Sequence, residues 1–132
     1  MAELMGGRRT ATAVIAASGS DSAAVAMGED QVIGVMPPAT GTGDFDASTV
    51  NLLYKVSVDG TNYQLLRDPA GAVVYTTVAQ NNTYGAMYIE GKTFKPWSFV
   101  KVCTYQTDKA TPQTQTAETS IVLILGPVRS YK

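Results

Sequence analysis

The chain has 132 residues, enough for one domain with a hydrophobic core and too few for two. It contains no histidine and one cysteine, Cys103, which excludes within one subunit a Ser-His-Asp triad, a Cys-His pair, a Cys/His zinc site and a structural disulfide. Ten basic and eleven acidic side chains give a formal net charge of −1, so the chain lacks the excess of positive charge with which proteins bind nucleic acid or an anionic membrane.

Charged residues make up 16% of the chain, below the ~25% of average soluble domains. A surface with so few charges suits a protein that works inside an assembly, and it favours proteins or neutral ligands as partners. We therefore predict that the chain is not an enzyme, that it has no catalytic, cofactor-binding or metal-binding residues, and that it needs no cofactor.

The first twelve residues are rich in Gly, Ala and Arg and show no apolar period. They predict an extended arm at residues 1–12, which orders on a neighbouring molecule, followed by a single domain at residues 13–132. The apolar stretch at 12–17 after Arg8 and Arg9 is shorter than the usual core of a signal peptide, and no run of about twenty apolar residues exists to span a membrane.

Runs of β-branched and alternating residues predict eight strands, near residues 11–17, 23–27, 31–36, 48–58, 62–67, 72–79, 97–106 and 119–128. Loop-forming clusters separate them at 18–22, 37–44 and 108–115, and the irregular segment 80–96 has room for one extra strand at 86–89. No helical period is visible. Eight strands are typical of a jelly roll, so the predicted fold is all-β: a single jelly-roll-like antiparallel β-sandwich with an N-terminal arm.

The clearest local signal is a hairpin at residues 52–66, where two β-rich runs flank Asp59-Gly60. This dipeptide predicts a tight turn of the primed type, with positive φ at Gly60. Residues 68–71, Asp-Pro-Ala-Gly, then have the residue order of a type I turn. With the strand that follows, these turns predict three consecutive antiparallel strands in a meander.

Cys103 lies in an alternating strand that puts it on one face with Phe99, Lys101 and Tyr105, whereas Val100, Val102 and Thr104 occupy the other face. Free cysteines behave mainly as small hydrophobic residues, and nothing nearby lowers the pKa of this thiol decisively. We predict a buried or half-buried thiol that is a poor nucleophile.

Other polar and aromatic features have structural explanations that we prefer. Asp44 and Asp46, with Glu29 and Asp30, could supply oxygen ligands to Ca²⁺, but the spacing of a calcium loop is missing and solvated loop carboxylates are expected. The sequon at residues 81–83 is interpreted as a chance match. Trp97 and the seven tyrosines are expected to pack in the core or at an interface.

The final strand, residues 119–127, is apolar on both faces, which fits a central strand or one whose outer face meets another subunit. Several turn and strand motifs precede this strand. In chain order they are Gly34-Val35-Met36-Pro37, the segment Ser57-Val58-Asp59-Gly60-Thr61-Asn62-Tyr63, the turn Asp68-Pro69-Ala70-Gly71, the segment Phe94-Lys95-Pro96-Trp97-Ser98-Phe99-Val100-Lys101-Val102 and a Gln-rich loop. In these motifs the chain, from Val32 onward, resembles small accessory proteins of tailed-bacteriophage virions.

This resemblance implies a capsid decoration, or cement, protein with a jelly-roll fold. Such a subunit would bind the outer surface of the capsid across neighbouring copies of the major capsid protein, its expected partner. It would be a homo-oligomer, a dimer or trimer, with no nucleic acid or membrane partner. The same motifs fit a component of a phage tail or baseplate.

A second resemblance is to discoidin-type, galactose-binding-like jelly rolls, which share the pattern Ser57-x-Asp59-Gly60-x-x-Tyr63 followed by Phe94-x-Pro96-Trp97. It implies a module that binds carbohydrate through loop aromatics. The chain departs from this pattern, because its loops at 37–47 and 107–117 contain one aromatic residue, Phe45, and no Arg or His. Carbohydrate binding therefore ranks below a structural role in the virion.

Overall fold

The structure is a computed structural model, and it describes residues 8–38, 45–47, 49–80, 86–89, 94 and 97–127. All named elements in these ranges are strands. They are β1 (Arg9–Ile15), β2 (Val25–Ala26), β3 (Gln31–Met36), β4 (Thr49–Ser57), β5 (Gln64–Leu65), β6 (Tyr75–Ala79), β7 (Met87–Tyr88), β8 (Phe99–Tyr105) and β9 (Thr119–Gly126). The predicted all-β class is confirmed, and β7 is the extra strand for which residues 86–89 had room.

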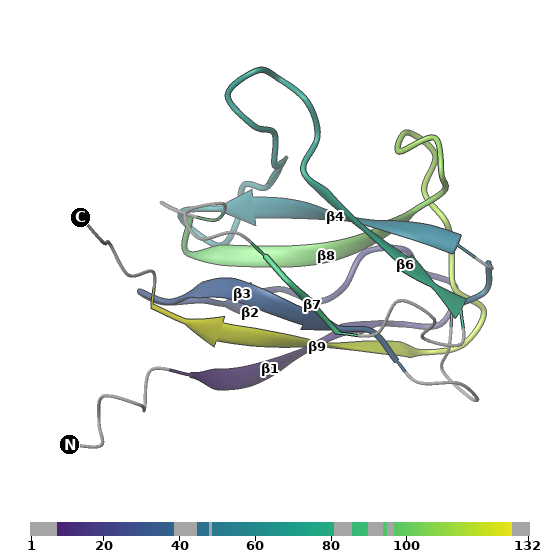
Figure 1. The fold of residues 1–132 in the computed structure, drawn as a ribbon, viewed down its shortest axis with the longest axis horizontal. Coiled ribbons are helices and arrows are strands. Elements are labelled where there is room, and N and C mark those ends of the chain that lie inside the picture. Colours follow the sequence, from purple (N-terminus) through teal and green to yellow (C-terminus); the bar gives the residue numbers. More distant parts are fainter. Residues whose placement is uncertain are drawn as a thin grey trace.

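The strands form two antiparallel sheets that pack face to face (Figure 1). One sheet has the strand order β1-β9-β3-β7, and we call it the β9 sheet. The other has the order β2-β8-β4-β5, with β6 also paired to β4, and we call it the β4 sheet. In Figure 1 the strands β4, β8 and β6 form one layer, and β1, β9 and β3 form the other.

The pairing is that of a jelly roll. β1 pairs with β9, β2 with β8, β3 with β7 and β4 with β6. In addition, β9 pairs with β3 and β8 pairs with β4. Such a chain is wound as a doubled ribbon, and successive pairs of strands alternate between the sheets. The predicted jelly-roll-like β-sandwich is therefore confirmed, and β5 is a short addition between β4 and β6.

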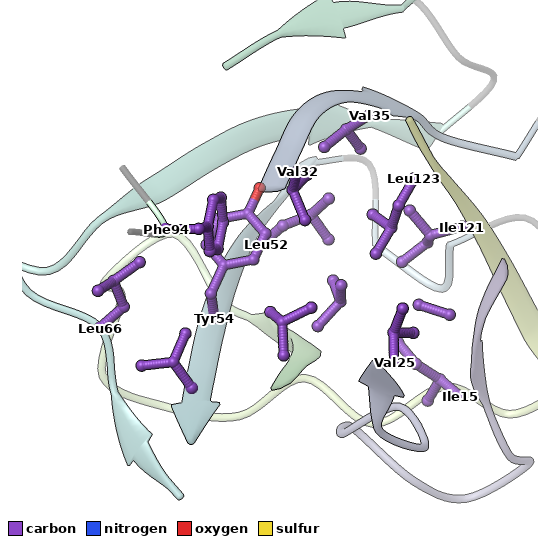
Figure 2. Packing of buried hydrophobic residues seen from close by; sticks show 14 of the residues in the cluster. Ile15, Val25, Val32, Val35, Leu52, Tyr54, Leu66, Phe94, Ile121 and Leu123 are labelled. Carbon is purple, nitrogen blue, oxygen red and sulfur yellow. The ribbon is translucent and has the colours of Figure 1, made fainter. Parts of the chain in front are cut away.

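The core forms because alternate residues of the strands in both sheets point inward. In β4 and β9 these residues are fully buried, and they face one another across the sandwich (Figure 2). At one end, the ring of Phe94 packs edge-on against Tyr54, with 5.1 Å between ring centroids. The buried Tyr54 hydroxyl shares a 2.6 Å hydrogen bond with the hydroxyl of Thr76, so its polar atom is satisfied inside the sandwich.

The hairpin after β4 differs in part from the predicted tight turn. Gly60 has a φ of +81°, as predicted. However, Lys55 pairs with Leu65 and Val56 pairs with Gln64, so the loop is longer than two residues and the primed two-residue turn is wrong. The Asp59 carboxylate sets the longer loop, because its Oδ1 accepts hydrogen bonds from the backbone N–H groups of Thr61 and Asn62.

The predicted meander forms only in part: the segments after β5 and before β6 meet at one antiparallel bridge, between Arg67 and Val73, but β5 and β6 themselves do not pair with each other. Both strands pair with β4, along successive parts of the same edge. Between them the chain leaves the sheet and turns at residues 68–71, where Gly71 N–H donates to the carbonyl of Asp68 at 2.9 Å. The connection from β4 to β6, in teal in Figure 1, therefore projects beyond the layer formed by β4 and β8.

The sheet begins earlier than the predicted boundary of the N-terminal arm. β1 starts at Arg9, and Arg9 pairs with Leu125, so residues 9–12 belong to the β9 sheet. Their Thr and Ala side chains suit an edge strand, and the Arg9 guanidinium fixes this end by donating to Asp30 and to the carbonyl of Met27, each at 2.9 Å. The rest of the predicted arm, residues 1–7, lies outside the described residues.

Candidate functional site

The outer face of the β9 sheet carries no charged side chain in the part of the chain that the structure describes. Its composition follows from alternation: Ala13, Ile121 and Leu123 are buried inward, so their strand neighbours point outward. We call these outward residues the β9 face: Thr10, Thr12, Val14, Gly34, Met36, Tyr88, Ser120, Val122 and Ile124.

Strand register arranges the β9 face in rows. Ile124 lies between Thr10 of β1 and Gly34 of β3, and Gly34 in turn pairs with Tyr88 of β7. A Cβ atom at Gly34 would lie 3.2 Å from Ile124 Cγ1, so the missing side chain gives the Ile124 side chain its space over β3. The neighbouring row contains Val122 and Met36.

Two large side chains of the β9 face are strongly exposed: Tyr88 at 86% and Met36 at 46%. The flanking Val122 and Ile124 are partly exposed. Contiguous apolar surface without charge is uncommon on isolated soluble domains and marks an interaction surface. The two-sided apolar pattern of the last strand thus has a structural explanation: one side of β9 enters the core and the other belongs to this face.

The outer face of the β4 sheet has the opposite character. It carries three lysines, and each of them has a partner. Lys55 forms a 2.6 Å ion pair with Asp21. The hydrogen bond to Asp21 raises the pKa of the Lys55 ammonium, whereas partial burial of the ammonium lowers it by a smaller amount. Lys101 lies over the ring of Tyr63 at 4.5 Å and Lys109 over the ring of Tyr75 at 4.1 Å.

Cys103 lies on the outer side of β8, opposite Leu53 of β4, and is fully buried. Burial is the main cause that raises the pKa of its thiol to about 12, and the nearby Asp21 carboxylate adds to the effect. At neutral pH the sulfur is therefore a protonated thiol shielded from solvent. The prediction of a buried thiol is confirmed.

Two of the carboxylates considered for Ca²⁺, those of Asp30 and Asp46, bind groups of the protein itself. Asp30 bonds to Arg9, and Asp46 accepts hydrogen bonds from the backbone N–H and hydroxyl of Thr116. Asp44 and the sequon at 81–83 lie outside the described residues. Among the residues described, no group of three His, Cys, Asp or Glu side chains is placed to hold a metal ion. In the same part of the chain, no helix has the length and hydropathy that crossing a membrane requires.

The sequence indicated that β9 is apolar on both sides but did not reveal the rest of the β9 face. The tyrosines were expected to pack in the core or at an interface, but the sequence did not indicate where Tyr88 lies. Its strand has only two residues, and its pairing partner Gly34 is far away in the sequence. Alternation in the strand 31–36 was the available signal for Met36. Only the pairing of β3 with β9 and β7 brings these side chains together.

No model of a known protein family matches this chain, and a search of curated proteins finds no match.

Proposed function

We propose that this chain is a structural virion protein that decorates the outer surface of a phage capsid and binds across neighbouring copies of the major capsid protein. The observation that supports this proposal most directly is the β9 face, which is uncharged in its described part and partly apolar, with Tyr88 and Met36 exposed. Burying such a face against a protein shell releases water from apolar surface and leaves no side-chain charge without a partner.

Stabilisation of the shell would follow from mass action. A protein that binds the expanded, assembled lattice and not its separate subunits stabilises that lattice by its free energy of binding. Each contact can be weak, because many copies occupy equivalent positions. The jelly-roll fold supports this role through its rigidity: both sheets are fixed by long-range strand pairing, so the β9 face is presented without a change in shape.

Attachment through the β9 face would leave the β4 sheet pointing away from the shell. Its three partnered lysines and the projecting connection from β4 to β6 would then face solution (Figure 1). The same face would serve a tail or baseplate component equally well. Mass spectrometry of intact and tail-stripped virions separates the two roles, because decoration requires far more copies per particle than a tail component.

The experiment that tests the role is re-addition of purified protein to expanded capsids that lack it. We expect binding and a higher temperature of capsid disruption. The double variant Met36→Asp, Tyr88→Asp places two charges in the β9 face and should abolish both effects. The matched control is Tyr75→Asp, which alters a side chain that is likewise 46% exposed but lies on the β4 sheet.

The proposal is contradicted if the wild-type chain does not bind the capsids, or if it binds them with no gain in capsid stability. Equal loss of binding in the β9-face variant and in the control would contradict the role of the β9 face. Size-exclusion chromatography with light scattering on all three proteins reports whether each keeps the same oligomeric state, which we expect to be a dimer or trimer.

A further inference from the structure

An open pocket of about 450 Å³ lies where β4 ends. Its size falls in the ~300–1,000 Å³ range of small-molecule pockets. The loop after β4, strand β5 and Trp97 just before β8 form its walls. No described residue of the loops at 37–47 and 107–117 lines it.

The pocket has an aromatic and aliphatic wall. Trp97, the only tryptophan of the chain, is half-buried and packs against the core, and it lines the pocket with Leu65 and Leu66. The backbone holds the tryptophan in place, because its N–H donates to the carbonyl of Phe94 at 2.8 Å and the next residue donates to Ser57. The indole, which packs against the core on one side, offers apolar surface to a ligand in the pocket.

The remaining wall offers hydrogen-bonding groups that the protein does not use. Arg67 donates from Nη1 to the carbonyl of Gly71 at 2.9 Å, and no protein partner is found for its Nε and Nη2 groups among the described residues. The exposed Gln64 amide likewise has no partner in that part of the chain. Asn62 donates its amide to Asp59 at 2.8 Å and keeps its Oδ1 as a free acceptor.

The loop that carries these groups is preorganised. Asp59 Oδ1 accepts from Ser57 Oγ and from the backbone N–H groups of Thr61 and Asn62, at 2.8 to 2.9 Å. A ligand therefore meets a fixed arrangement and does not have to order a mobile loop, which lowers the entropic cost of binding. Among the described residues, the pocket lining contains one carboxylate and one guanidinium, and this balance of charge favours a neutral ligand.

We infer that this pocket binds a neutral pyranose sugar, whose C–H face would lie on the indole of Trp97 while its hydroxyl groups bond to Gln64, Arg67 and Asn62. A pyranose has the two properties that the pocket requires, an apolar ring face and an edge of neutral donors and acceptors. The inference goes beyond the proposed role in the capsid and does not depend on it.

Because Trp97 is the only tryptophan, its fluorescence reports binding in the unmodified full-length chain. We would titrate the protein with glucose, galactose, mannose, N-acetylglucosamine and the β-linked disaccharides of glucose and N-acetylglucosamine. At least one should give a saturable change in emission. Glycerol at matched concentration should give none. Arg67→Ala should weaken the affinity about tenfold and Gln64→Ala about threefold, which correspond to the loss of a charged and of a neutral hydrogen bond.

The matched controls are Arg8→Ala and Gln106→Ala, which remove exposed side chains that do not line the pocket. They should bind like the wild type. No saturable change with any of these sugars would overturn the inference, and so would equal affinity in the pocket and control variants. The assay contains no capsids, so its failure and a failure of capsid binding are distinguishable.

Discussion

Gly60 and Gly28 both have positive φ, +81° and +64°, but their surroundings differ. A Cβ atom at Gly60 would lie 3.2 Å from the ring of Phe99, whereas nothing lies within 4 Å of one at Gly28. We expect Gly28→Ala to lower the free energy of unfolding by about 1–2 kcal/mol through backbone strain alone. Gly60→Ala should cost more, since the Phe99 ring must also move, and Gly60→Val should cost more again.

Chemical denaturation of the three variants measures these differences. The positive-φ conformation at Gly60 would be contradicted if Gly60→Val left the denaturation midpoint unchanged. Equal costs for the two alanine variants would show that the Phe99 ring adapts freely.

Asp59 makes the hairpin loop sensitive to acid. Hydrogen bonds from the backbone of Asn62 and then of Thr61 hold the pKa of its carboxyl well below the usual value. A carboxyl with a lower pKa in the folded than in the unfolded state stabilises the fold above its unfolded pKa, which is about 4. That contribution is lost as the pH falls toward the folded value.

We therefore expect Asp59→Asn to lower the denaturation midpoint at pH 7. The substitution keeps an oxygen acceptor but removes the charge. The gap between wild type and variant should narrow as the pH falls below about 4. A series of urea denaturation curves from neutral to acidic pH measures the gap, and a gap that stays constant would contradict this role of the carboxylate.

The first strand offers a test of where the sheet begins. Deleting residues 1–7 should leave the melting temperature within a few degrees, because this segment has no apolar period. Deleting residues 1–12 removes part of the ladder between β1 and β9 and the Arg9–Asp30 ion pair. It should cost about 2–4 kcal/mol, which corresponds to roughly 5–15 °C in melting temperature.

Calorimetry of the two truncated chains measures these shifts. Equal melting temperatures would mean that residues 9–12 add nothing to the sheet. A large loss on deleting residues 1–7 alone would show that the segment before β1 contributes to folding.

The strands themselves could be predicted from the sequence, because alternation in β3, β4, β8 and β9 reflects one face turned toward a core. Their partners could not, because the pairing of β1 with β9 leaves no local signal. The Asp59-Gly60 loop was predicted as too short, since the Ser57 and Asp59 side chains replace the backbone bonds of a tight turn. The pocket could not be predicted, because Trp97 is far in sequence from Gln64 and Arg67 and only the fold brings these residues together.

For the subunit as a whole, the absence of charge on the β9 face predicts how salt affects attachment. Screening weakens interactions between exposed charges and leaves apolar contacts intact. The affinity for capsids should therefore change by less than about threefold between low and high salt. Co-sedimentation across a series of sodium chloride concentrations measures this dependence. A steep loss of binding with salt would mean that the lysines of the β4 sheet, and not the β9 face, make the contact.

The first-with-last pairing has a consequence for how the protein is made. Arg9 pairs with Leu125, so at ~5–20 residues per second the ribosome delivers β9 at least roughly six seconds after β1. Until then β1 has no partner, and contacts of such long sequence separation also make folding slow. The β9 face combines strands that are far apart in the sequence, so a polypeptide that ends before β9 cannot form it completely. In the proposed role in a capsid, such truncated chains would lack the complete attachment surface.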